Sequence, residues 1–287
     1  MPRTLDEALE MKAARHDAVP LAGGTDLMVE LNFGRLRPPA ILDVSRLPEL
    51  RSIARRDGAC VLGAGVPYSR ITSDLREFVP LVQASRSVGS PQIRNRGTVG
   101  GNLGTASPAG DALPVLAAYG AAVILGSVRG TRTLPWHEFL RAPKKTAIAP
   151  DELIVSATWR TSRMTGSFSK IGTRNAMVIA VASLCLVIDE DARQVRVALG
   201  SVGPTILEAP DAQASMGAAM TAAGAWEDPM VTIPQAAIDD FGERVAGAAQ
   251  AIDDVRGTAA YRRHALTVMA RRALGWALSD RRRARWW

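Results

Sequence analysis

The chain has 287 residues, a mass of 30.5 kDa and a hydrophobic content of 47%, enough for two modest domains or one large domain with a sizeable core. This composition excludes a disordered or fibrous chain. The net charge of +7 is concentrated at one end, because residues 256–287 hold nine arginines and one aspartate, whereas the first 255 residues hold 26 basic and 27 acidic side chains. A nucleic-acid interface needs a basic patch on the folded body, so we expect no nucleic-acid partner.

The metal-ligating side chains are isolated from one another in the sequence. Cys60 and Cys185 lie in separate apolar runs, and His16, His137 and His264 have no Cys, His or carboxylate cluster around them. We therefore expect no metal on this chain and no iron–sulfur cluster. No signal peptide is visible, and the longest apolar stretches fall short of the roughly 20 residues of a membrane span. These features predict a cytoplasmic protein with reduced cysteines and no membrane span.

The first 65 residues predict a small α/β unit. Residues 4–14 suit a short amphipathic helix in which Thr4 is the N-cap and Glu7 follows three positions later. A strand at 19–22, a Gly-Gly-Thr-Asp turn and a helix at 27–32 follow. Short β-type runs at 40–44 and 59–62 are bounded by Pro, Asp and Gly.

The remainder predicts a second α/β subdomain and a different C-terminal domain. The second subdomain is expected to hold a helix at 67–88, a glycine-rich interruption at 89–111, a helix at 112–119, and strands at 121–125 and 152–159. The C-terminal domain is expected to hold a hairpin of 176–188 with 194–201, an Ala-rich helix at 209–223, and a long helix at 258–278. The solvent-facing side of this last helix is basic. The Ser/Thr/Arg/Gly-rich stretch at 161–166 marks the boundary. We expect α/β subdomains at about 1–65 and 66–163, a smaller α+β domain at 167–280, and a basic tail at 281–287.

Two glycine blocks carry the chemical information. In Leu21-Ala22-Gly23-Gly24-Thr25-Asp26-Leu27, a strand ends, the chain turns at a double glycine and a helix begins. Such a turn lets the backbone approach a ligand, and the free amides at the helix start suit an anion such as a pyrophosphate. The alternative is an ordinary strand-to-helix turn capped by Thr25 or Asp26, and this block alone favours that alternative.

The second block runs from Arg94 to Asp111. It holds Gly100-Gly101 after two arginines, and Ser107 and Asp111 then supply a hydroxyl and a carboxylate. Two amide nests with one acid suit a dinucleotide, with donors for its phosphates and an acceptor for sugar hydroxyls. A glycine-rich surface loop is an equal alternative. Neither block is a Rossmann fingerprint or a P-loop.

Both blocks resemble the FAD-binding loops of the flavoprotein (medium) subunits of molybdenum hydroxylases, the family of carbon monoxide dehydrogenase and bacterial xanthine dehydrogenase. The similarity extends to residues 42–50, to Phe168-Ser169-Lys170 with Arg174, and to residues 254–263, so it spans nearly the whole chain. It implies a PCMH-type FAD-binding region followed by a C-terminal domain of the carbon monoxide dehydrogenase flavoprotein type.

The resemblance also implies a set of FAD-binding residues. Amides of the two loops would hold the pyrophosphate and neighbouring groups, Ser107 and Asp111 would bind ribityl or ribose hydroxyls, Ile154 would lie against the flavin, and Lys170 would stabilise negative charge on the reduced ring. The implied set is Ala22, Gly23, Gly24, Thr25, Asp26, Thr98, Val99, Gly100, Gly101, Asn102, Ser107, Asp111, Ile154 and Lys170. No catalytic residue is implied on this chain beyond the flavin. Without the family, Lys170 reads equally well as a solvated lysine.

By the same resemblance, the chain would be an oxidoreductase subunit in a dimer of heterotrimers. A large subunit would carry the molybdopterin cofactor and hydroxylate the substrate, a small subunit would carry two 2Fe–2S clusters, and FAD would pass electrons to NAD, a quinone, a dye or oxygen. One alternative is a self-sufficient FAD oxidase of the same broad fold, for which the C-terminal part is short. Another is a binding module that uses residues 281–287 on nucleic acid or a membrane, although a frayed end or a subunit contact explains them better.

One position departs from the family pattern. Many members have an Asp before the Ile-Ala that follows the Lys and Arg, where this chain has Val178. A missing carboxylate there removes local negative charge, which affects flavin potential or acceptor choice. The sequence leaves open the substrate, the acceptor, the role of the tail and whether the isolated chain retains FAD.

Overall fold

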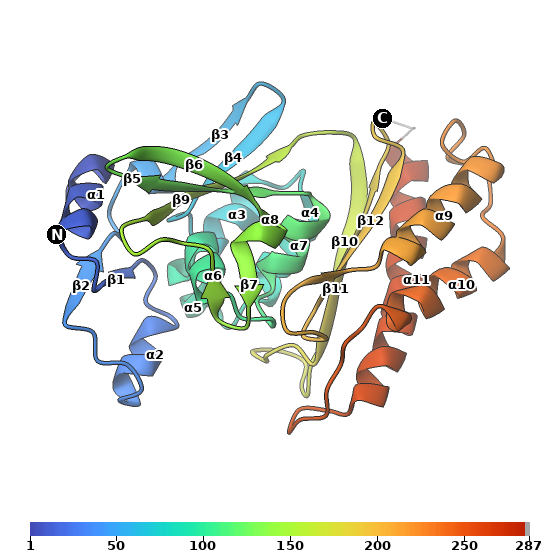
Figure 1. The fold of residues 1–287 in the computed structure, drawn as a ribbon. Coiled ribbons are helices and arrows are strands. Elements are labelled where there is room, and N and C mark those ends of the chain that lie inside the picture. Colours follow the sequence, from blue (N-terminus) through green and yellow to red (C-terminus); the bar gives the residue numbers. More distant parts are fainter. Residues whose placement is uncertain (285–287) are drawn as a thin grey trace. The chain divides into compact units, whose positions relative to one another are not determined.

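The computed structural model describes residues 1–284 and divides into two compact units (Figure 1). Unit 1 comprises residues 1–74, 88–107 and 120–161. Unit 2 comprises residues 75–87 and 108–119 together with the chain from residue 162 onward. Two short segments from the middle of the sequence therefore group with the C-terminal part.

Unit 1 is built around one antiparallel sheet with short helices. Its helices are α1 (Leu5–Ala14), α2 (Leu27–Asn32), the 3-10 turn η1 (Glu49–Arg51), α3 (Tyr68–Asp74), α5 (Pro91–Arg96), α6 (Val99–Thr105) and α8 (Trp136–Phe139). Its strands are β1 (Ala18–Leu21), β2 (Ala40–Asp43), β3 (Ile53–Arg56), β4 (Ala59–Gly63), β5 (Ala122–Ser127), β6 (Gly130–Pro135), β7 (Leu140–Ala142), β8 (Lys145–Thr146) and β9 (Leu153–Arg160).

The main sheet of unit 1 joins both halves of the expected FAD-binding region. Its strand order is β3-β4-β9-β5-β6, and β9 pairs antiparallel with both β4 and β5. Strands from either side of residue 65 thus share one sheet, because β9 returns between them. The parallel pair β1–β2 lies apart from this sheet. The predicted first helix is confirmed: α1 begins after Thr4, whose hydroxyl accepts a hydrogen bond from the Glu7 amide at 3.2 Å.

The single helix predicted over 67–88 is wrong. The structure ends α3 at Asp74 and begins α4 (Val79–Ser87) after four intervening residues, with Pro80 in the first turn. Proline is tolerated only in the first turn of a helix, because it lacks an amide donor and clashes with the preceding turn. The break separates the two units, since α3 belongs to unit 1 and α4 to unit 2.

Unit 2 is a three-layer arrangement around an antiparallel meander. Its strands are β10 (Met164–Ile171), β11 (Ala182–Asp189), β12 (Gln194–Gly200) and β13 (Leu207–Glu208), and its helices are α4, α7 (Ala112–Ala118), α9 (Pro210–Ala222), α10 (Gln235–Gly247) and α11 (Ala259–Ala284). Figure 1 shows α9 and α11 on one face of the sheet, with α10 against them, and α4 and α7 on the other. Every residue of β11 is buried, because both faces of this strand are covered. The predicted hairpin is confirmed, while residues 176–181 lie outside its strands.

The segment expected as a basic tail is helical as far as the structure describes it. Helix α11 continues through Arg281, which is 3% exposed, pairs with Glu190 at 3.0 Å and lies over the Trp226 ring. These contacts hold the helix past Ser279. Trp286 and Trp287 lie outside the described residues. Among the helices of residues 1–284, none is both long and apolar enough to cross a bilayer.

Candidate functional site

The first glycine block follows β1 directly. Leu21 ends the strand and accepts a hydrogen bond from the Val44 amide at 2.9 Å, so the chain leaves the β1–β2 pair at Ala22. Gly24 has φ = +76°, a left-handed conformation that glycine adopts at little cost. Within residues 1–284, no group accepts a hydrogen bond from the amides of residues 23–25. These donors are therefore available to an anion.

The Asp26 side chain, one of the two expected caps, bonds elsewhere. Asp26 stands at the N-cap of α2 but makes no side-chain capping bond there. Its carboxylate accepts instead from the Thr105 hydroxyl of α6, at 2.8 Å. This bond ties the first glycine block to the second, across 79 residues of sequence.

The second glycine block is a helix start rather than an open loop. Thr98 is the N-cap of α6, and its hydroxyl accepts from the Gly101 amide at 3.0 Å. The Gly100 amide donates to the Ala64 carbonyl at 2.9 Å, and the Asn102 amide donates to the Thr98 carbonyl at 3.0 Å. Three of the five amides expected to face a ligand thus have protein acceptors. The buried Oδ1 atom of Asn102, in contrast, has no partner within the described chain.

The two glycine blocks touch through their backbones. A Cβ atom added to Gly23 would lie 2.0 Å from the carbonyl oxygen of Arg96 in the second block. One added to Gly100 would lie 2.6 Å from the carbonyl oxygen of Ala64, which belongs to neither block. Glycine is needed at both positions because the chain segments approach too closely for a side chain. The tertiary structure therefore unites the two motifs that the sequence shows separately.

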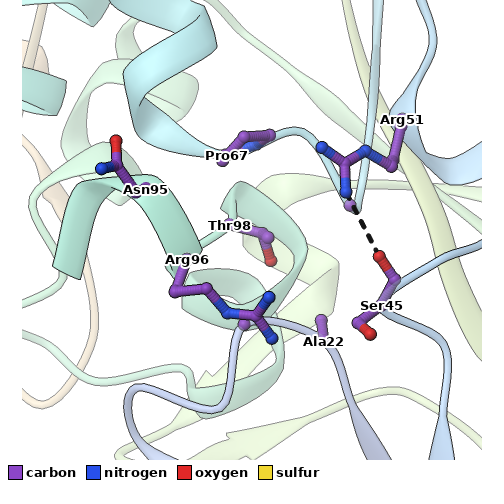
Figure 2. Close-up of a pocket in the computed structure, with 9 residues that line it drawn as sticks. Ala22, Ser45, Arg51, Pro67, Asn95, Arg96 and Thr98 are labelled. Carbon is purple, nitrogen blue, oxygen red and sulfur yellow. Dashed lines mark hydrogen bonds between the residues drawn. The ribbon is translucent and has the colours of Figure 1, made fainter. Parts of the chain in front are cut away.

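A pocket opens where these blocks meet (Figure 2). It is lined by Ala22, Gly23, Ser45, Arg51, Gly65, Pro67, Asn95, Arg96 and Thr98. Two guanidinium groups reach it from different elements, Arg51 from η1 and Arg96 from the end of α5, and Arg51 also donates to the Ser45 carbonyl at 3.4 Å. Backbone amides with two guanidinium groups favour a phosphate-bearing ligand.

Ionised Asp43 lies beside this pocket. Burial raises the pKa of its carboxyl, but hydrogen bonds from Ser45 and the charges of Arg46 and Arg96 outweigh burial, so the pKa is lowered overall. Among the pocket residues, the sequence pattern gave no ligand role to Arg51 or Ser45. Ser45 lies in the segment 42–50 that carries the family resemblance, and Arg51 follows that segment directly, so this segment was the available signal.

Asp111 and Lys170, which the resemblance gives separate roles, form a buried ion pair in unit 2. The Lys170 Nζ lies 2.6 Å from the Asp111 Oδ2, and their side chains are 10% and 6% exposed. Burial is the largest influence on Asp111 and raises the pKa of its carboxyl, although Lys170 and Ser87 oppose the shift. The pairing spans 59 residues, and the sequence did not predict it.

Ser107 and Ile154 belong to unit 1. Ser107 is half-buried, two residues beyond the end of α6. Ile154 lies on β9, and its Cδ1 atom would be 3.6 Å from a Cβ added to Gly104 of α6. Ile154 therefore sits beside the helix that carries the second glycine block.

These features fit a flavin dinucleotide. Unit 1 supplies amides for which residues 1–284 provide no acceptor, two guanidinium groups and a buried Asn102 oxygen without a partner. Buried polar atoms without partners are rare in folded proteins, and a ligand with several hydroxyl and phosphate groups would satisfy them. No group of three or more His, Cys, Asp or Glu suited to a metal occurs in residues 1–284.

Comparison with known proteins identifies the family. The family described as "FAD binding domain in molybdopterin dehydrogenase" matches residues 1–158, more than half of the chain. The chain belongs to this family. A second family, "CO dehydrogenase flavoprotein C-terminal domain", matches residues 167–277. The chain is thus an FAD-binding oxidoreductase subunit of the molybdenum hydroxylase type, as the family resemblance implied.

Individual relatives are FAD subunits and medium chains of dehydrogenases. The nicotinate dehydrogenase FAD-subunit of Eubacterium barkeri is 35% identical over 63% of this chain, a match that spans 64% of the relative's length. The caffeine dehydrogenase subunit beta of Pseudomonas sp. (strain CBB1) is 33% identical over 71% of this chain and 72% of its own. The glyceraldehyde dehydrogenase medium chain of Sulfolobus acidocaldarius is 29% identical over 94% of both chains.

Solved structures confirm the fold. A chain of the carbon monoxide dehydrogenase from Hydrogenophaga pseudoflava superposes with a TM-score of 0.84 at 25% identity, covering 97% of this chain and 96% of that one. A chain of quinoline 2-oxidoreductase from Pseudomonas putida 86 gives a TM-score of 0.86 at 21% identity, covering 97% and 95%. The mixed α/β fold predicted for this flavoprotein family is therefore confirmed.

Proposed function

We propose that this chain binds FAD and acts as the electron-transfer subunit of a heteromeric molybdenum hydroxylase. In this proposal, electrons arrive from iron–sulfur clusters of a partner subunit and leave from FAD to an external acceptor. The contact between the two glycine blocks carries the proposal, because it places amides without acceptors beside two guanidinium groups. When bound, FAD supplies the redox chemistry, and the protein supplies binding, orientation and electrostatics.

The first glycine block and its pocket would hold the pyrophosphate. The amides of residues 22–26 donate to phosphate oxygens, and Arg51 and Arg96 add charge-assisted bonds from the pocket wall. Thr98 and Val99 contribute at the start of α6. Gly100 and Gly101 act mainly by permitting close approach, since their amides already have acceptors.

The remaining predicted residues would bind the sugar and ring portions. Ser107, Asp111 and the Asn102 side chain offer acceptors to hydroxyl groups, and two of these have a buried oxygen without a partner. Ile154 would contact the flavin. Lys170 would place an ammonium near the ring, an ammonium whose charge is largely balanced by Asp111.

The proposed complex contains a large molybdopterin subunit and a small subunit with two 2Fe–2S clusters, as a dimer of heterotrimers. The need for a partner follows from the absence of cluster ligands in residues 1–284, where Cys60 and Cys185 are both buried and far apart in sequence. A cytoplasmic location belongs to the same proposal, since buried thiols persist in reducing compartments. The acceptor would be NAD, a quinone or oxygen.

Two measurements test this proposal. The full chain is purified alone and titrated with FAD, and Arg96→Met is compared with Arg37→Met, an exposed arginine outside the pocket. We expect about a tenfold weaker FAD affinity for Arg96→Met, because a charge-assisted hydrogen bond is lost, and no change for Arg37→Met. Equal affinities for the two variants would remove Arg96 from the site.

The second measurement concerns the complex. Co-purification from the native source is expected to recover FAD together with molybdenum- and iron-containing polypeptides. Reduction of the bound flavin by substrate should require those polypeptides. Flavin reduction by a simple alcohol or amine in the isolated chain would contradict the proposal and favour a self-sufficient oxidase.

A further inference from the structure

Within residues 1–284, Asp111 uses one of its two carboxylate oxygens. Its Oδ2 atom accepts from the Lys170 Nζ at 2.6 Å and lies 2.9 Å from the Ser87 hydroxyl. Its Oδ1 atom is buried and has no partner among residues 1–284. All three residues belong to unit 2, so this geometry is internal to one compact body.

The local position of Asp111 would ordinarily give its carboxylate a different use. Asp111 is the N-cap of α7, where an aspartate normally accepts from the amides of the first helical turn. Here it makes no capping bond. The carboxylate is turned toward the end of α4 and toward β10 instead, which is where Ser87 and Lys170 are placed.

Ser87 connects the two partners of the carboxylate. It is the last residue of α4, its hydroxyl lies within hydrogen-bond distance of both the Ala84 carbonyl at 2.7 Å and Asp111, and its own carbonyl accepts from the Lys170 Nζ at 3.2 Å. The hydroxyl has one proton, and the charged carboxylate is the stronger acceptor. Ser87, Asp111 and Lys170 thus each contact the other two, and Ser87 and Lys170 both contact the Oδ2 atom of Asp111.

Holding Oδ2 in this way determines the direction of the free oxygen. A buried carboxylate oxygen without a donor is unfavourable, so the arrangement persists only where another interaction compensates for it. We propose that Ser87 and Lys170 are positioning residues that fix Asp111 through Oδ2, so that Oδ1 is presented as the acceptor for a hydroxyl group of bound FAD. This inference rests on the proposed function and adds Ser87, which no sequence motif indicated.

The inference also changes the role of Lys170. Its ammonium donates to Asp111 and to the Ser87 carbonyl, so it acts through the carboxylate rather than as an isolated cation. Replacement of Ser87 is therefore the more specific test, because it leaves the ion pair in place.

The experiment measures the Kd for FAD, and the thermal unfolding of the FAD-free form, for the full chain and its variants. Ser87→Ala is expected to weaken FAD binding threefold to tenfold, because Oδ2 loses one of its two anchors. Ser87→Thr keeps the hydroxyl and should restore the Kd. The matched control is Ser73→Ala: Ser73 also contacts a carbonyl three residues before it, at 3.0 Å, and an aspartate at 2.5 Å, but on the surface of unit 1. The Kd of the Ser73→Ala variant for FAD should equal that of the wild-type chain.

A double variant tests whether Ser87 acts through Asp111. Asp111→Ala alone should weaken FAD binding more than Ser87→Ala does, and the double variant Ser87→Ala/Asp111→Ala should be no weaker than Asp111→Ala. A purely structural role for Ser87 would instead lower the unfolding temperature of the FAD-free form and add to the Asp111→Ala effect.

The outcomes separate this inference from the proposed function. If the wild-type chain binds FAD and Ser87→Ala binds it equally well, the positioning role is wrong while the proposed function stands. Additive losses in the double variant, or an Asp111→Ala variant with the wild-type Kd, would also overturn the inference. A wild-type chain that does not bind FAD overturns both.

Discussion

The two units accommodate polar groups by different means. In unit 1, backbone packs against backbone: Gly23 lies on the Arg96 carbonyl and Gly100 on Ala64, leaving amides open beside a pocket. In unit 2, buried charged side chains have charged partners: Asp111 pairs with the buried Lys170, and the buried Arg262 pairs with Asp254, which is more exposed. The first arrangement should fail when a Cβ atom is added, and the second when a charge is removed.

This difference explains why only one unit was easy to read from the sequence. A close backbone approach requires glycine, so it leaves a recognisable Gly-Gly motif at each contact. A buried ion pair requires two common residue types at positions that only the fold brings together. The predictions below test this contrast, from the largest expected effect to the smallest.

The buried arginine of unit 2 should be the most sensitive position for stability. The Arg262 side chain is 3% exposed and donates to the Val181 and Ser201 carbonyls at 2.7 and 2.6 Å and to Asp254 at 2.6 Å. Arg262→Met should lower the free energy of unfolding by about 3 kcal/mol, because these acceptors lose a buried donor. Denaturant unfolding measures the change.

Its matched control is Arg256→Met. Arg256 also pairs with Asp254, at 3.4 Å, but its side chain is 43% exposed. A surface ion pair contributes little, so no measurable change in unfolding is expected. Equal losses for the two variants would show that charge pairing in unit 2 does not depend on burial.

The first glycine block should be the most sensitive position for ligand binding. Gly23→Ala places a Cβ atom 2.0 Å from the Arg96 carbonyl oxygen, so the two blocks must separate. The expected result is a loss of FAD affinity of more than tenfold and a cost in stability of about 1–3 kcal/mol. FAD titration and thermal unfolding measure the two effects.

Gly217→Ala is the control for this substitution. Gly217 lies within α9, and a Cβ atom there would meet nothing within 4 Å. Alanine should stabilise the helix by about 0.5–1 kcal/mol and leave FAD binding unchanged. If Gly23→Ala behaved like Gly217→Ala, close backbone approach would not define the unit 1 site.

Buried carboxylates in the two units should respond to pH in opposite ways. Hydrogen bonds from Arg132 lower the pKa of Glu152, with burial opposing, so its contribution to stability is present above the unfolded pKa and lost as pH falls through the folded one. Burial raises the pKa of the Asp111 carboxyl in the folded state, so the folded state loses stability as the pH rises through this raised pKa.

Thermal unfolding across pH 3–7 tests these signs. The destabilisation caused by Glu152→Gln should shrink as pH falls, whereas any destabilisation caused by Asp111→Asn should shrink as pH rises. Parallel trends for the two variants would contradict the assignment of hydrogen bonding as the dominant influence in unit 1 and burial in unit 2.

The smallest effect is expected at Val178, where the family often has Asp. Val178 is half-buried and packs against Gly172 in the segment between β10 and β11. In the assembled complex, Val178→Asp should change the ratio of turnover with NAD to turnover with a dye by a few-fold, because it adds a negative charge. Val178→Asn, of equal size, should not; identical ratios for all three proteins would contradict the hypothesis.

The sequence alone determined the fold family and one half of the site. Local signals sufficed for α1, with its Thr4 cap, and for the helix at Leu27–Asn32. They also sufficed for the two glycine blocks, whose residue type is dictated by backbone conformation and close approach. By contrast, β3 and β10 were missed, and α3 and α4 were read as one helix, because these boundaries depend on packing and on Pro80 in a first turn.

Only the tertiary structure decided which side chains meet. It brought Gly23 to Arg96, Asp26 to Thr105 and Lys170 to Asp111. It also gave protein acceptors to three of the backbone amides that were expected to donate to a ligand. It also buried Arg281 in a helix where the sequence suggested a tail. Contacts between residues far apart along the chain leave no periodicity and no required residue type in the sequence. These contacts form only when β9 and β11 take their central places in the two sheets and the helices pack on the sheets.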